Sequence, residues 1–108
     1  MSKQRVGEFE EIVMLAVGRL ADDANSVNIQ EILGEDAGRD ASLGAIYAAL
    51  DRLERKDCVT SWLAEPTGER GGRAKRHYAL TELGRDALAE LRRVRELMWK
   101  SMLAEDGR

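Results

Sequence analysis

A short basic segment with two adjacent glycines constrains the fold of this chain more than any other part of it. Between Arg70 and Thr81 the sequence reads RGGRAKRHYALT, so four cations and a Gly-Gly pair lie just before a β-like run. Another β-like run, Cys58–Leu63, precedes the segment, and Thr81 can cap a helix that follows it. The pattern predicts a β-hairpin with a positively charged tip, whose second strand is Lys75–Leu80.

Length and composition limit the class of protein. The chain has 108 residues, of which 44% are hydrophobic and 34% are charged, as expected for one soluble, helix-rich domain. A single cysteine excludes an internal disulfide, and no apolar run approaches the ~20 residues that a membrane span needs. Residues 1–5 lead into a polar amphipathic segment without the apolar core of a signal peptide. We therefore expect a cytoplasmic protein with no membrane association.

Two helices are predicted before residue 40. The first is expected over residues 7–21, because apolar residues recur there at helical spacing: Phe9, Ile12, Val13, Ala16, Val17 and Leu20. The second is expected to begin near Asn28, which can cap it, and to end at Gly34 or Gly38. Both helices present one apolar stripe to a common core.

A third helix is predicted from Ser42, a credible N-cap, to about Lys56. Ile46, Leu50 and Leu53 are expected to point inward. The opposite face is mostly polar or small and carries Leu43, Tyr47, Ala48, Asp51, Arg52 and Arg55. The small residues of its first turn would let the helix N-terminus approach phosphates and base edges closely.

The last helix is predicted to be long. Thr81 caps it, Glu82 lies in its first turn, and about 25 residues follow with helical periodicity. Its apolar stripe consists of Leu83, Ala87, Leu91, Val94, Met98 and Met102, widened by Leu88, Trp99 and Leu103. Because a body of about 80 residues cannot cover so long a stripe, we expect residues 81–108 to form a dimerisation helix and residues 1–80 a separate DNA-binding domain.

Charge is distributed unevenly along the chain. The formal net charge is −3, which alone argues weakly against nucleic acid as a partner. Residues 7–40, however, hold nine acids and two bases, whereas residues 42–80 hold seven bases and five acids. A local positive face matters more for phosphate binding than the total charge does, so the second region is the candidate interface.

Three helices followed by a two-stranded hairpin form the winged variant of the helix-turn-helix. The expected fold is therefore mainly α (α+β): a winged helix-turn-helix with a two-stranded β-hairpin wing and a long C-terminal dimerisation helix. In such a fold the third helix enters the major groove of double-stranded DNA, and the wing touches the neighbouring phosphate backbone.

The chain resembles the PadR-like transcriptional regulators over nearly its whole length. The motifs that carry the resemblance are Gly7-Glu8-Phe9-Glu10, Ser42-Leu43-Gly44-Ala45-Ile46-Tyr47-Ala48-Ala49-Leu50-Asp51-Arg52-Leu53-Glu54, Arg70-Gly71-Gly72-Arg73 and Tyr78-Ala79-Leu80-Thr81-Glu82-Leu83-Gly84. In combination these motifs are specific, although each one alone is weak.

The resemblance implies a homodimeric repressor that binds a pseudo-palindromic operator and is released by a small molecule or another signal. With one C-terminal helix, the chain is similar to the short subfamily. It departs from the family pattern at Asp57, where a glycine is usual before the first wing strand. The acidic region of residues 7–40 is a second departure and must face away from DNA.

Residues of the third helix and of the wing are the predicted DNA contacts. They are Ser42, Gly44, Ala45, Tyr47, Arg52, Arg70, Gly71, Gly72, Arg73, Lys75 and Arg76. For Ser42 the capping role is sufficient by itself, and Tyr47 could instead belong to the core. For the wing cations the alternative is a solvated charged loop, but their place beside a helix-turn-helix favours contact with DNA.

The dimer contacts are predicted to involve Phe9, Leu91, Val94, Met98, Trp99 and Met102. A sharper hypothesis, which the resemblance permits, is that Trp99 and its dimer mate flank a cavity for a small apolar or aromatic effector. Packing between the two chains is the simpler alternative.

Other classes of function find little support in the sequence. The single histidine, His77, lies in the predicted wing, so no Ser-His-Asp set or metal site is evident, and no cofactor is expected. Cys58 is expected to be a small buried residue rather than a redox sensor. The alternative to a DNA-binding regulator is a protein-interaction module that uses a winged-helix scaffold without specific DNA binding.

Overall fold

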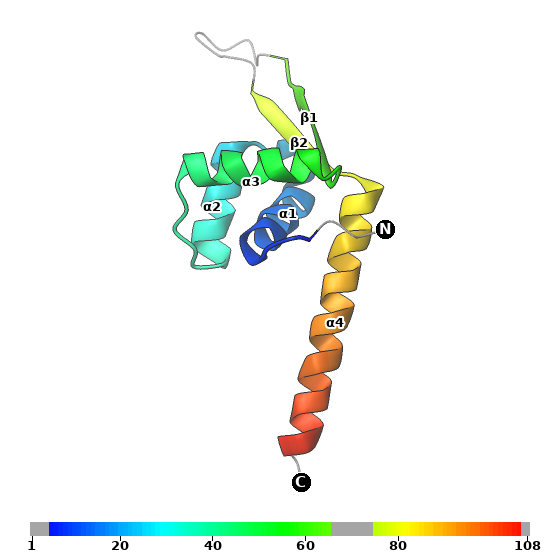
Figure 1. Cartoon of the computed structure of the whole chain (residues 1–108). Helices are drawn as coiled ribbons and strands as arrows, with labels where there is room; N and C mark the ends of the chain where they lie inside the picture. The colour runs from blue at the N-terminus through cyan, green and yellow to red at the C-terminus, as the bar shows by residue number, and fades with distance from the viewer. Residues whose placement is uncertain (1–4, 66–74, 107–108) are drawn as a thin grey trace.

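The computed structural model describes residues 5–65 and 75–106 and confirms the predicted fold class (Figure 1). The elements follow in the order α1 (Glu8–Leu20), the 3-10 turn η1 (Ala21–Asp23), α2 (Ser26–Asp36), α3 (Leu43–Arg55), β1 (Val59–Leu63), β2 (Arg76–Leu80) and α4 (Glu82–Asp106). Three short helices form a body, the hairpin rises on one side of it, and α4 extends away from it on the other side (Figure 1). This arrangement is a winged helix-turn-helix with a long C-terminal helix.

The core lies where α1, α2 and α3 meet beneath the hairpin. Its largest fully buried side chains are Met14, Ile29, Leu33, Ile46, Leu50, Leu53, Val13 and Val17. The inward direction predicted for Ile46, Leu50 and Leu53 is therefore confirmed. Such close packing of apolar side chains supplies most of the free energy that holds the three helices together.

The start of α2 differs from the prediction. Asn25, not Asn28, is its N-cap: the Asn25 side chain accepts a hydrogen bond of 3.0 Å from the Asn28 backbone N–H. The Asn28 side chain donates instead to the carbonyl oxygen of Asp23. Gly34 lies inside the helix, and the chain leaves it before Gly38, whose φ of +61° suits glycine. The helix thus begins earlier than predicted, whereas its end just before Gly38 agrees with the second of the two glycines proposed as its end.

The hairpin has a regular antiparallel register. Val59 pairs with Leu80 at the base and Leu63 pairs with Arg76 at the far end of the described strands. Val59 and Tyr78 are buried, so this face of the sheet closes the core. The backbone N–H of Tyr78 also donates to the Ala24 carbonyl oxygen (2.9 Å), which ties the hairpin to the turn between α1 and α2.

A compact junction connects the hairpin to α4. The Thr81 hydroxyl donates to the Asp57 carbonyl oxygen (2.6 Å) and accepts from the Gly84 N–H (3.0 Å), so its predicted capping role is confirmed. A Cβ atom at Gly84 would lie 2.1 Å from the Cys58 carbonyl oxygen, which explains the glycine there. Asp57 adopts φ +61°, the left-handed conformation expected where the family usually has glycine.

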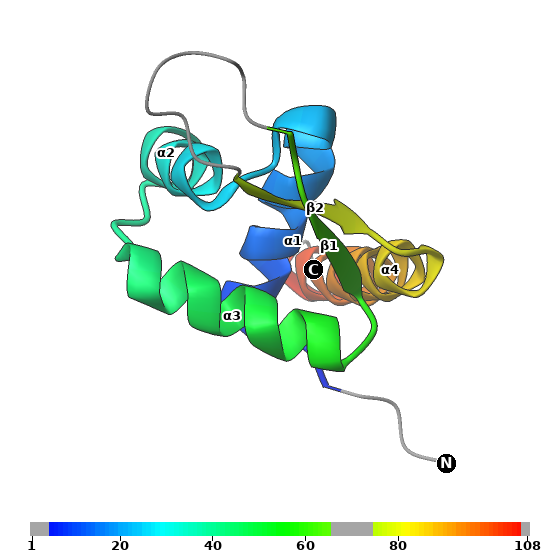
Figure 2. The same cartoon turned by 90° about the horizontal axis from the view of Figure 1, so that it is seen from above.

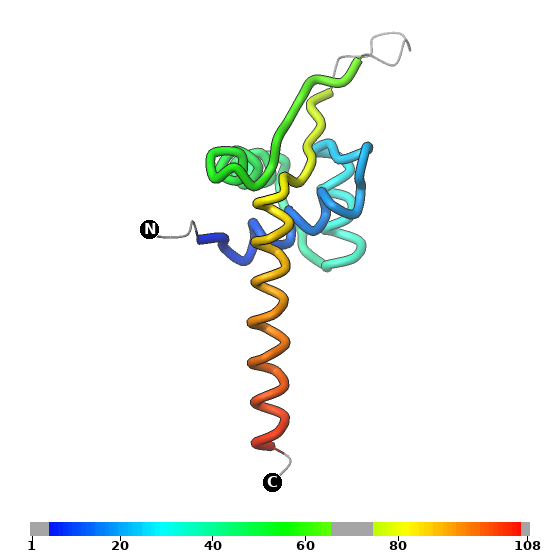
Figure 3. Tube along the Cα trace, turned by 90° about the vertical axis from the view of Figure 1, so that its right-hand side faces the viewer, coloured from blue at the N-terminus to red at the C-terminus, as the bar shows by residue number. Residues whose placement is uncertain are grey.

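Most of α4 stands free of the body (Figures 1 and 3). Its first part is held by the junction, but every residue in the range 92–106 is exposed. The molecule is consequently elongated, with extents of 64 × 35 × 21 Å. Neither α4 nor any other helix in the described ranges combines the length and apolar character that crossing a membrane would require.

Candidate nucleic-acid interface

The α3 helix has one buried face and one open face. Ile46, Ala49, Leu50 and Leu53 are fully buried, whereas the residues of the open face are exposed. Seen from above, α3 runs along the outside of the body beside the hairpin (Figure 2). This places the helix beside the wing, the arrangement by which a winged helix reads a duplex.

The start of α3 is open and preorganised. The Ser42 hydroxyl accepts a hydrogen bond of 3.0 Å from the Ala45 N–H and so caps the helix, as predicted. Gly44 and Ala45 are exposed and carry almost no side chain. A ligand can therefore approach the backbone of this first turn closely, where the helix dipole favours negative charge.

Tyr47 combines features of a core residue and of an exposed DNA contact, the two roles considered for it. Half of its surface is exposed (50%), yet its hydroxyl is 2.9 Å from the Ser26 hydroxyl of α2, which is buried. The hydrogen bond fixes the ring on the α2 side of α3 and leaves part of it open. Tyr47 is neither a core residue nor a freely rotating surface side chain.

Arg52 occupies the opposite flank of α3. Its Nε donates to Glu10 Oε2 of α1 (2.8 Å), and the same carboxylate accepts from Lys56 Nζ (2.8 Å). The sequence did not suggest this contact, because Glu10 and Arg52 are 42 residues apart.

The centre of the open face contains an ion pair that was not among the predicted contacts. Arg55 Nη2 donates to the Asp51 carboxylate one turn earlier. The i, i+4 spacing of opposite charges is the sequence signal for such a pair. Arg55 is the most exposed cation of the open face, and its partner Asp51 places a negative charge there as well.

The described part of the wing is linked to α3. Arg76 donates from Nη1 to the Ser61 hydroxyl of β1 (2.9 Å), and Ser61 donates to Glu54 Oε2 of α3 (2.9 Å). Lys75 is exposed. The other predicted wing contacts lie outside the described residues: Arg70, Gly71, Gly72 and Arg73.

His77 and Cys58 have structural surroundings. His77 Nδ1 is 2.8 Å from the Asp22 carbonyl oxygen, and its ring lies beside Trp62 with 6.0 Å between ring centroids. Burial raises the pKa of the Cys58 thiol above its usual value, which disfavours the reactive thiolate. Within the described ranges, no group of three potential metal ligands comes together.

The exposed part of α4 carries a broad apolar face. Its large exposed side chains are Leu83, Val94, Leu97, Met98, Trp99, Met102 and Leu103. Leu91 is partly buried. Phe9, the remaining predicted dimer residue, packs within its own chain, with the Arg39 guanidinium 5.3 Å from its ring centre. Contiguous apolar surface of this kind marks interaction sites on soluble proteins.

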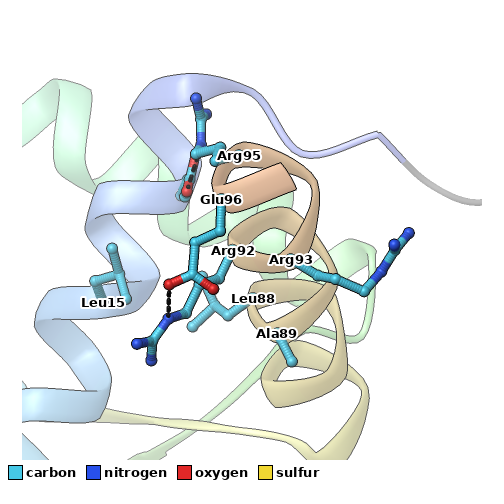
Figure 4. Close-up of a pocket in the computed structure, with 8 residues that line it drawn as sticks. Leu15, Leu88, Ala89, Arg92, Arg93, Arg95 and Glu96 are labelled. Carbon is cyan, nitrogen blue, oxygen red and sulfur yellow. Dashed lines mark hydrogen bonds and ion pairs between the residues drawn. The ribbon is translucent and has the colours of Figure 1, made fainter. Parts of the chain in front are cut away.

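A groove of about 510 Å³ lies between α1 and the middle of α4 (Figure 4). It has an apolar floor and a charged rim and is lined by Glu11, Leu15, Leu88, Ala89, Arg92, Arg93, Arg95 and Glu96. On the rim, Arg95 holds Glu11 of α1 through two hydrogen bonds of 2.6 and 3.2 Å. In the described part of the chain, none of the predicted dimer residues lines this groove.

A comparison with protein-family models identifies one family for this chain. The family model described as the transcriptional regulator PadR-like family matches residues 18–90. A comparison with curated proteins found no match.

Solved structures are similar over most of the chain. A PadR-like transcription factor from Bacteroides fragilis is 26% identical, with a TM-score of 0.77 over 93% of this chain and 91% of that chain. A PadR family transcription regulator from Clostridium difficile is 23% identical, with a TM-score of 0.71 over 89% and 96%. Bacillus subtilis PadR in complex with operator DNA is 21% identical, with a TM-score of 0.59 over 77% of this chain and 45% of that chain.

Proposed function

Because this chain belongs to the PadR-like family of transcriptional regulators, we propose that it binds operator DNA sequence-specifically as a homodimer. The observation that carries the proposal is the two-faced α3 beside a wing, with its inner face fully buried and its first turn open. The structure of Bacillus subtilis PadR with operator DNA shows a protein of similar fold bound to such a ligand. The family consists of transcription regulators rather than enzymes.

We assign base recognition to the start of α3 and phosphate contacts to its flank and the wing. Ser42, Gly44, Ala45 and Tyr47 lie at the N-terminal half of the helix, where base edges are read in the major groove. The proposed phosphate contacts are the cations and glycines Arg52, Arg70, Gly71, Gly72, Arg73, Lys75 and Arg76. The wing thus supplies affinity, and α3 supplies most of the specificity.

We propose that α4 forms the dimer. None of the residues that the structure describes covers its exposed apolar side chains, and a second copy offers the same apolar face. A two-fold dimer would present two α3 helices to two half-sites of a palindrome. Leu91, Val94, Met98, Trp99 and Met102 are the proposed contacts, and Phe9 contributes at the edge of α1.

We further propose that the protein is a repressor whose DNA binding responds to a small apolar or aromatic effector. The groove between α1 and α4 supports a ligand site near the dimer helix, because its floor is apolar and its rim is charged. A ligand there would contact both the body and α4, and it could therefore change how the two α3 helices are presented.

The test is selection of DNA sequences from a random pool by the purified full-length chain at physiological salt. We expect enrichment of a pseudo-palindrome whose half-sites are separated by about one helical turn, near 34 Å. Gel-shift titration of the selected site against scrambled DNA then gives the specificity ratio. Enrichment of no sequence, together with tight capture of another protein, would support an interaction module instead.

A further inference from the structure

Glu10 is the only buried carboxylate in the described ranges 5–65 and 75–106, with 4% of its surface exposed. It lies in the first turn of α1 and faces the last turns of α3. A buried carboxylate is stable only when its oxygens are paired, so its partners show what it holds in place.

Three donors surround Glu10. Oε1 accepts from the Gly7 N–H and from Lys56 Nζ, both at 2.8 Å, and Oε2 accepts from Arg52 Nε at 2.8 Å. Burial pushes the pKa of Glu10 upward, but the hydrogen bonds from Lys56, Gly7 and Arg52 outweigh it and leave the pKa below its usual value. At neutral pH the group is therefore a fixed negative charge between Arg52 of α3 and Lys56, the C-cap of that helix.

Arg52 is left with unused donors. Its contact with Glu10 engages Nε, and the structure gives its Nη1 and Nη2 groups no partner among the described residues. About half of the Arg52 side chain is exposed, on the edge of the open face of α3. A guanidinium held through Nε keeps its plane fixed while its two Nη groups can still donate to a phosphate.

We propose that Glu10 is a positioning residue for DNA binding: it orients Arg52 so that the Nη groups meet a phosphate of the operator beside α3. This inference rests on the proposed DNA-binding function and extends it to a residue of α1. Glu10 does not touch DNA in this arrangement, because it is buried behind the arginine. Ordering a long side chain in advance removes an entropy cost from binding, which corresponds to about tenfold in affinity.

A double-mutant cycle separates positioning from general support of the fold. Affinity for the selected operator is measured for the unaltered chain, Glu10→Gln, Arg52→Ala and the double variant, at a temperature where circular dichroism shows each to be folded. We expect about a tenfold loss for each single variant, and the double variant should bind no more weakly than Arg52→Ala. Arg52→Ala should also reduce the slope of log K against log salt by about 1.

Glu8→Gln is the matched control. It makes the same chemical change in the same turn of α1, but it breaks the ion pair between Glu8 and Arg39. Arg39 belongs to the loop between α2 and α3. We expect it to leave affinity for the operator within about twofold.

A second variant covers the case in which Glu10→Gln does not fold. Arg52→Lys keeps the charge but lacks the planar fork, so we expect a several-fold loss of affinity with an unchanged salt slope.

Three results would overturn the inference: losses that add in the double variant, Arg52→Lys binding like the unaltered chain, or unchanged affinity in Glu10→Gln. In each of these the unaltered chain still binds its operator, so the proposed function stands. Absence of DNA binding by the unaltered chain would overturn both.

Discussion

The two helices on which the proposed function depends, α3 and α4, have opposite relations to the rest of the chain. In its 13 residues, α3 buries four apolar side chains, and each of its flanks is hydrogen-bonded to another element. In its 25 residues, α4 buries only Gly84. Within the described ranges, one bidentate ion pair, Arg95 with Glu11, fixes its middle to α1.

One chain alone packs the apolar side of α3 but leaves the apolar side of α4 exposed. The surroundings of α3 are finished within the monomer: its apolar side is packed, and its polar flanks have partners in α1, α2 and β1. The apolar side of α4 faces water, which costs free energy roughly in proportion to its area. We therefore expect α3 to depend on the fold of the chain and α4 to depend on the concentration of a second chain.

Met98→Glu should produce the largest effect, because it should prevent a second copy of the chain from packing against the apolar face of α4. In a two-fold dimer the substitution would place two carboxylates in an apolar interface, at a cost of about 4 kcal/mol or roughly 1,000-fold in dimer affinity. Sedimentation equilibrium measures this directly. Lys100→Glu, which adds a carboxylate outside the apolar stripe of α4, is the control and should remain dimeric. A dimeric Met98→Glu protein would show that α4 is not the interface.

A matched pair of leucine truncations compares the two helices directly. Leu50→Ala removes a fully buried side chain of α3 and should lower the free energy of unfolding by about 3 kcal/mol. Leu97→Ala removes a side chain of α4 that is 56% exposed and should cost less than about 0.5 kcal/mol in the monomeric Met98→Glu background. Urea titrations give both values, and similar losses would contradict the distinction between the helices.

Acid should weaken the anchoring of α3 through Glu10. The folded-state pKa of Glu10 is below its ordinary value of 4.5, so its stabilisation is complete above that pH and is lost as the pH falls through the folded pKa. As the pH falls from 5 through the folded-state pKa, the free energy of unfolding of the unaltered chain should fall by about 1 kcal/mol more than that of Glu10→Gln. Thermal unfolding at a series of pH values measures the difference.

Asp57→Gly should have the smallest effect. Asp57 occupies a left-handed conformation that glycine adopts without strain, whereas glycine gains more freedom in the unfolded chain. The two effects nearly cancel, and we expect a gain of about 0.5 kcal/mol in the free energy of unfolding, measured by urea titration. A clear loss would show that the aspartate side chain itself supports the turn between α3 and β1.

Local patterns in the sequence were sufficient to predict most of the architecture. Apolar periodicity located α1, α3 and α4, and the hydroxyl caps at Ser42 and Thr81 mark the starts of two helices within a residue. These signals act within one helical turn, so they can be read from neighbouring residues. The predicted start of α2 was wrong because Asn25 and Asn28 are both good N-cap residues, and local sequence does not decide between them.

The contacts of the candidate interface could not be predicted in the same way. The hydrogen bond between Ser26 and Tyr47 and the one between Glu10 and Arg52 join residues 21 and 42 positions apart. No periodic pattern encodes such pairs, because they arise from how the helices pack. Sequence reasoning therefore placed Tyr47 and Arg52 on the open side of α3 but did not reveal what restrains them.

The junction at Thr81 couples the orientation of α4 to the position of the wing. A single residue separates β2 from α4, and Gly84 lies against the Cys58 carbonyl group, so the strand and the helix must move together. Over 25 residues α4 is about 37 Å long. In the proposed dimer, a rotation of the chain by about 5° about the far end of α4 would therefore displace the hairpin by about 3 Å. This displacement is close to the 3.4 Å rise of one base pair. Small changes in how two copies of α4 cross would thus alter which half-site spacing the pair of wings can span.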